Sequence, residues 1–149
     1  MIQRKQTLYL LASIILTAVC LSLPLGEIEP KGIAEPMVAY SLFIKGSTVD
    51  FLTWPLFAIM IVLYPISITT IAMFKKRILQ AKLCIWAVAV IFVWYAYFLY
   101  LCFIRFVDMG TFHAGLATYI PLLTIICYLL ARKGIMDDEK LVRSADRIR

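Results

Sequence analysis

Four apolar runs alternate with shorter polar segments along the chain, at residues 7–25, 51–74, 83–104 and 114–131. The third run contains no charged residue. A helix rises about 1.5 Å per residue, so this run spans about 33 Å, enough to cross a hydrocarbon core of roughly 30 Å. Backbone groups in lipid must be satisfied within the segment itself, which favours a helix. The pattern predicts an all-α membrane protein, with four transmembrane helices bundled in a single domain of residues 1–149.

Positive charges are distributed unevenly around these runs. One side would carry Arg4, Lys5, Lys75, Lys76, Arg77, Lys82, Arg132, Lys133, Lys140, Arg143, Arg147 and Arg149. The other side would carry only Lys31, Lys45 and Arg105. The side that is rich in Lys and Arg is normally cytoplasmic. We therefore expect both termini inside, an outer loop at residues 26–50 and a cytoplasmic tail at residues 132–149.

The outer loop contains several helix breakers, namely Pro30, Gly32, Pro36 and Gly46. Residues 37–44 within it are apolar and rich in strand formers, which predicts a short extracytoplasmic strand or hairpin over the helix ends. Residues 47–50 resemble a capping box, so we expect the second helix to start there. Residues 105–113 are expected to form only a short outer turn.

Four prolines fall within the apolar runs, and two of them, Pro65 and Pro121, lie away from the ends of their runs. Pro65 lies in the middle of the second run and would free the carbonyl of Ile61, so a kink is expected. Pro121 lies in the first half of the fourth run. Pro65 is either a functional hinge or a tolerated kink, since proline is common in membrane helices.

The composition excludes several classes of function. The chain is 63% hydrophobic, which leaves too few residues for a separate soluble catalytic domain, and its +6 net charge is not gathered into a nucleic-acid-binding face. No Asp, Glu, Lys or Arg lies inside a run, which argues against a single-chain proton pump or coupled transporter. With His113 as the only histidine, one chain cannot form a bis-imidazole haem site or a three-histidine metal site. We expect no cofactor and no enzymatic activity.

The remaining chemistry lies near the ends of the runs. Arg105, Asp108 and His113 are weak outer-face candidates that could form a metal or acid/base site with a glutamate of the outer loop. The alternative is an interfacial ion pair and a surface histidine. The third run also carries an aromatic cluster, which would either stack on a quinone or lipid or simply pack. Its members are Trp94, Tyr95, Tyr97, Phe98 and Tyr100.

The cysteines all fall within apolar runs, which is typical of small buried hydrophobic side chains. They are Cys20, Cys84, Cys102 and Cys127. No Cys-x-x-Cys pair is present, which argues against a disulfide oxidase. Cys20 and Cys102 both lie toward the outer side, so theirs is the one combination in which a bridge is conceivable.

The tail is expected to form a separate short helix capped by Asp137. An isolated helix of about 12 residues is marginal in water, so its apolar face should be covered. The cover would be a partner, the loop before the third run, or the lipid surface; alternatively the helix only caps the bundle. The candidate partner-docking residues are Leu141, Val142, Arg143, Ala145 and Ile148.

Two terminal motifs carry a resemblance to a known family. The chain opens with MIQRKQTLYLL at residues 1–11 and closes with DEKLVRSADRIR at residues 138–149. Together with four apolar runs, these motifs resemble an uncharacterised family of small bacterial inner-membrane proteins, known as a domain of unknown function. The resemblance implies a four-helix fold and a Gram-negative inner membrane, and it brings no activity, ligand or catalytic residue.

These observations favour a non-enzymatic inner-membrane protein that serves as an accessory or assembly subunit of a larger membrane complex. The alternative is a small oligomeric transporter or channel with Pro65 and Pro121 as gating kinks. A membrane enzyme with an outer-face site is a third hypothesis. The expected partners are the lipid bilayer and either a membrane protein or further copies of the chain, without nucleic acid.

Overall fold

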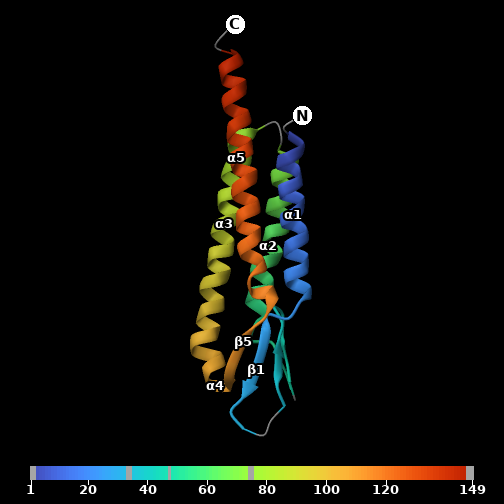
Figure 1. Cartoon of the computed structure of the whole chain (residues 1–149), viewed down its shortest axis with the longest axis vertical. Helices are drawn as coiled ribbons and strands as arrows, with labels where there is room; N and C mark the ends of the chain where they lie inside the picture. The colour runs from blue at the N-terminus through green and yellow to red at the C-terminus, as the bar shows by residue number, and fades with distance from the viewer. Residues whose placement is uncertain (1–2, 33–34, 47, 74–75, 147–149) are drawn as a thin grey trace.

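The computed structural model of the protein describes residues 3–32, 35–46, 48–73 and 76–146. Its long helices are α1 (Gln3–Ser22), α2 (Trp54–Ala72), α3 (Arg77–Tyr100) and α5 (Ile120–Asp146). These helices run side by side along the longest axis, with a small sheet at one end (Figure 1). We call this the sheet end, and the opposite end, where α3 begins and α5 finishes, the helical end.

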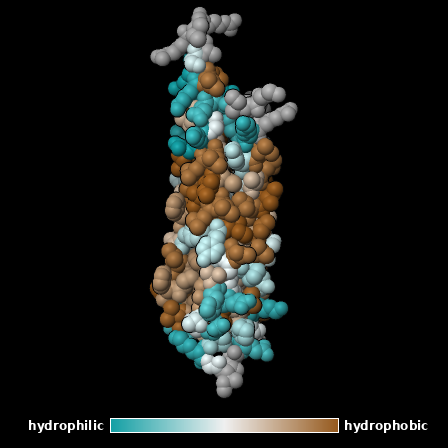
Figure 2. Space-filling view, viewed as in Figure 1, coloured by the Kyte–Doolittle hydropathy of each residue, from teal (hydrophilic) through white to brown (hydrophobic). Residues whose placement is uncertain are grey.

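Four helical segments of the described chain are long and apolar enough to cross a membrane. On the face shown in Figure 2, hydrophobic residues form a broad belt across the middle of the molecule, and hydrophilic residues gather toward both ends. The expected four-helix architecture is therefore confirmed at the level of helix number, length and apolar character.

The buried positions of every long helix repeat at alternating intervals of three and four residues. On α1 they are Gln6, Leu10, Ser13, Thr17 and Cys20, and on α2 they are Leu56, Met60, Leu63, Ser67 and Thr70. On α3 they include Gln80, Cys84, Ala87, Ile91, Trp94 and Phe98. On α5 they include Thr124, Tyr128, Ala131, Ile135 and Asp138. This 3.5-residue spacing is that of left-handed helical bundles, and we call these positions the seam.

Two buried hydroxyl side chains at the middle of the seam, Ser67 and Tyr128, form hydrogen bonds within the bundle. The Ser67 and Tyr128 hydroxyls lie 2.6 Å apart, and Ser67 also donates to the carbonyl of Leu63 at 2.8 Å. This pair of hydroxyls links α2 and α5 without an ionisable group that is charged at neutral pH.

A π-helical turn, η1 (Leu101–Phe106), follows α3 and leads into α4 (Val107–Met109). Regular seam spacing after Leu101 would place Arg105 inside the bundle. The wider turn adds one residue, so that Phe106 is fully buried and Arg105 is exposed. The expected outer turn at residues 105–113 is therefore wrong, because helical structure continues to Met109 and a strand follows it.

The sheet has five antiparallel strands in the order β4-β3-β2-β1-β5. They are β1 (Gly26–Pro30), β2 (Met37–Ala39), β3 (Ile44–Lys45), β4 (Val49–Asp50) and β5 (Gly110–Ala114). The expected strand or hairpin at residues 37–44 is confirmed as β2 and the start of β3. Strands β1, β4 and β5 were not predicted from the sequence. Strand β5 pairs with β1 from Gly26↔Ala114 to Pro30↔Gly110.

The predicted helix start at residues 47–50 is wrong. Val49 and Asp50 form strand β4, and α2 begins only at Trp54 after the N-cap residue Thr53. Ser47, the first residue of the expected capping box, lies outside the described residues. Proline in the first turn of α2 explains the later start, since it costs no helical hydrogen bond there.

Two expectations for the fourth run also need correction. Asp137 does not cap a separate helix, because α5 continues without a break from the apolar run to Asp146. Pro121 is the second residue of α5, where its missing N–H costs nothing, so it does not interrupt the helix interior. Pro65 does lie inside α2.

The pairing of β1 and β5 requires a close approach at Gly110. A Cβ at this position would fall on the carbonyl group of Glu29. We expect Gly110→Ala to lower the free energy of unfolding by about 1–3 kcal/mol, as overpacking does elsewhere. Thermal unfolding of detergent-purified protein measures this loss. Thr111→Ala, an exposed change on the same strand, is the control; equal melting temperatures for both variants would contradict the pairing.

Candidate functional site

The outer-face candidates lie on three successive elements near the sheet end. Arg105 lies in η1, Asp108 in α4 and His113 in β5, and all three are exposed. His113 Nε2 lies 3.5 Å from Glu29 Oε2 on the neighbouring strand. Because both side chains are more than half exposed, this contact contributes little to stability.

The described residues do not gather the outer-face candidates into a metal site. Within that part of the chain, no group of three His, Cys, Asp or Glu side chains could hold a metal ion. A cavity of about 330 Å³ lies beside His113, but most of its walls are apolar, from residues 23–24 and 114–117. The geometry here supports a structural contact between β1 and β5 and provides no assembled catalytic group.

The aromatic cluster of α3 is divided between core and surface. Trp94 is fully buried and stacks on Phe98 with ring centroids 5.3 Å apart. The Tyr95 hydroxyl donates to the carbonyl of Thr118 at 2.8 Å. Tyr100 is exposed. Trp94 therefore packs within the bundle and offers no open face to a quinone.

The thiol groups are free at all four cysteines. Cys20 and Cys84 lie on the buried seam, and Cys20 Sγ donates to the carbonyl of Ala117 at 3.5 Å. Neither Cys20 nor Cys102 is part of a disulfide. Their positions suit packing between helices.

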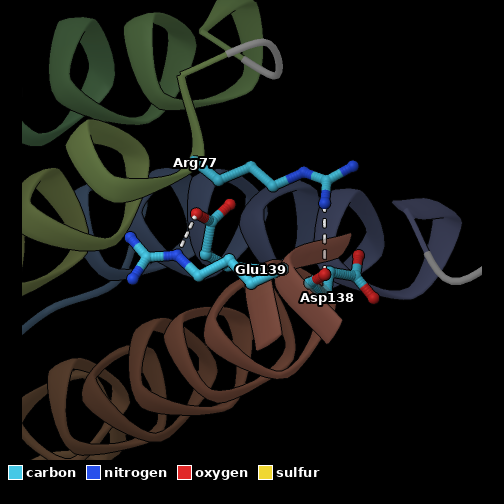
Figure 3. A network of polar contacts seen from close by, with 4 residues as sticks. Arg77, Asp138 and Glu139 are labelled. Atoms are coloured by element: carbon cyan, nitrogen blue, oxygen red, sulfur yellow. Dashed lines mark hydrogen bonds and ion pairs between the residues drawn. The ribbon is translucent and has the colours of Figure 1, made fainter. Parts of the chain in front are cut away.

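Asp138 joins three helices at the helical end. It is 7% exposed on α5, and its Oδ2 accepts a hydrogen bond of 2.5 Å from Gln6 Nε2 on α1. Its main-chain carbonyl accepts a bond of 3.1 Å from Arg77 Nη1 at the start of α3 (Figure 3). Asp138 is tolerated at a buried position because its carboxylate and its main-chain carbonyl each accept a hydrogen bond from a neighbouring helix.

The helices α1 and α5 approach closely one turn before Asp138. A Cβ at Gly134 would lie about 3.0 Å from Gln6 Cγ, which is tighter than ordinary packing. Glycine here allows the Gln6 side chain to reach along α5 to the carboxylate. Sequence reasoning missed this site, although the intervals from Tyr128 through Ala131 and Ile135 to Asp138 signal it.

Leu141, Val142 and Arg143 of the candidate docking residues belong to α5, whose end projects past the other helices (Figure 1). Leu141 and Val142 are 56% and 42% exposed. Arg143 Nε donates to Glu139 Oε1, one helical turn earlier, at 3.0 Å. Ala145 belongs to α5, but its side chain is outside the description, and Ile148 lies outside the described residues.

Comparison with known proteins gives one finding. The model of a family described as "Domain of unknown function (DUF4293)" matches residues 2–148. Neither the curated proteins nor the solved structures provide a match.

The Gln6–Asp138 bond is testable by a double-mutant cycle. Removal of the carboxylate in Asp138→Ala leaves a buried amide without its partner, so we expect a loss of about 1–3 kcal/mol. The double variant Gln6→Ala, Asp138→Ala should lose less stability than the sum of the two single losses, because each single change already removes the bond. Asp137→Ala, which loses only an exposed pair with Lys140, should cost less than about 1 kcal/mol. Additive effects on thermal stability would show that the bond contributes nothing.

Proposed function

The chain belongs to this family of unknown function, and on that premise we propose that it is a non-enzymatic integral protein of the bacterial inner membrane. Its role in this proposal is that of an accessory or assembly subunit of a larger membrane complex. The observation that carries the proposal is that the seam spacing of α5 continues beyond the buried Asp138 to Val142, an apolar residue that is exposed.

Membrane insertion is supported by the apolar belt. Large side chains within it point outward, including Phe103, Trp86 and Phe92, which are 74%, 64% and 62% exposed. Such a surface is costly in water and suits lipid. The excess of Lys and Arg at the helical end favours placing that end in the cytoplasm, with the sheet on the outer side.

A role in assembly is supported by the interior of the bundle. Leu63, Trp94 and Tyr128 are almost fully buried and fill the space between the helices. A path for solutes through one chain would require these side chains to move apart. The transporter or channel alternative therefore needs several copies of the chain.

The docking surface follows from the seam geometry. Asp138 is the last seam position of α5 that contacts α1 and α3. The next position at the seam interval is Val142, which is exposed together with its neighbour Leu141. The exposed apolar side chains of Leu141 and Val142 suit one occupant, an amphipathic helix at the cytoplasmic face of another membrane protein.

We expect Leu141→Ser combined with Val142→Ser to reduce recovery of one co-purifying membrane protein at least about tenfold, since both apolar anchors would be lost. The measurement is purification of the full chain in mild detergent, with the ratio of partner to chain quantified by mass spectrometry. A fixed ratio of partner to chain in preparations of the wild type would support the proposal. A photo-crosslinker at position 142 should form an adduct with that same protein.

The matched control is Lys140→Ser with Ser144→Ala, two exposed polar changes on the same projecting turns. This variant should retain the partner. A lone homo-oligomer would instead favour the transporter or channel alternative. Reduced thermal stability in the Leu141 and Val142 variant, with no partner at any stage, would mean that the end of α5 is only structural and would contradict the proposal.

A further inference from the structure

A cavity of about 380 Å³ lies at the helical end, between the start of α3 and the last turns of α5. It is lined by Lys76, Arg77, Ile78, Leu79, Lys82 and Glu139. Basic side chains form one part of the wall, and aliphatic side chains form another. A ligand that fits both parts would combine an anionic group with an apolar body.

The charges around the cavity favour an anion. Glu139 is already paired with Arg143, which compensates its negative charge. Arg77 uses Nη1 to bind the Asp138 carbonyl, and a guanidinium has five N–H donors, so others are left for a ligand (Figure 3). Among the described residues, no carboxylate forms an ion pair with Lys76 or Lys82.

The start of α3 adds to this attraction. The helix begins at Arg77 with no acidic side chain in its first turn and no side-chain cap from Lys76. The first N–H groups of a helix have no partner within it, and the helix dipole is positive at this end. The contribution is secondary to that of the three cationic side chains.

The apolar wall distinguishes a lipid from a small anion. Ile78 and Leu79 are 48% and 41% exposed beside the cations. Trp86 lies one helical turn beyond Lys82 and is 64% exposed, as expected of an indole at the membrane interface. The cavity then lies at headgroup depth. A free phosphate would leave the aliphatic wall in water.

We propose that this cavity binds the phosphodiester headgroup of an anionic phospholipid, with Lys76, Arg77 and Lys82 around the phosphate. The glycerol and first acyl carbons lie against Ile78 and Leu79. Basic pockets between helices on the cytoplasmic side are suited to such headgroups. The inference rests on the proposed membrane placement of the chain, and it assigns a lipid class to a site separate from the Leu141–Val142 docking surface.

The experiment is titration of the detergent-purified full chain with phosphatidylglycerol, followed by native mass spectrometry. Lys76→Gln combined with Lys82→Gln should weaken phosphatidylglycerol binding on the order of tenfold, because two of three cations are lost. Lys76→Arg with Lys82→Arg should restore binding. The charge-matched control, Lys133→Gln with Lys140→Gln, removes two exposed cations outside the cavity and should bind within about twofold of the wild type.

Three outcomes would overturn the proposal. Equal loss in the control would show general surface attraction, and equally tight binding of phosphatidylcholine would show that the cavity does not recognise net charge. Displacement of phosphatidylglycerol by millimolar inorganic phosphate would assign the site to a soluble anion.

Alkaline extraction of the membranes separately tests the proposed placement of the chain in the membrane. Release of the wild-type chain into the soluble fraction would contradict the proposed function, whatever the lipid titration shows.

Discussion

The rest of the structure depends on the seam, the set of buried positions that repeats every 3.5 residues on all four long helices. In the membrane placement proposed above, lipid tails would be as apolar as leucine, so the helices could not associate by excluding water. Close packing and internal hydrogen bonds would have to replace that force. The seam supplies both. Its central layer joins Ser67 and Tyr128, and its last layer joins Gln6 and Asp138.

The two ends of the bundle use different means to satisfy their polar groups. At the sheet end, β5 pairs with β1, so the connection after α1 and the connection after α3 share one ladder of hydrogen bonds. The π-helical turn of η1 contributes by keeping Arg105 outside and Phe106 inside. At the helical end, Asp138 accepts bonds from α1 and α3, and α5 then projects alone.

Sequence reasoning located the four apolar helices because a run without charge has few alternatives to a membrane span. It placed the end of the fourth helix wrongly, because the charged residues after Ala131 are good helix formers and Gly134 is accommodated against Gln6. It missed β5, whose partner β1 lies far away in the sequence. It placed Asp138 in the charged cytoplasmic tail, although Asp138 follows the buried Ile135 at the three-residue interval of the seam and is itself buried.

The central claim is that the bundle crosses the membrane with its sheet end and helical end on opposite sides. Cysteine labelling tests this claim most directly, with Lys45→Cys on β3 and Lys140→Cys on α5, both at exposed positions. In intact cells with a permeable outer membrane, a maleimide that cannot cross the inner membrane should label position 45 at once. Position 140 should react only after permeabilisation. Labelling of both positions in intact cells, or of position 140 alone, would contradict the account.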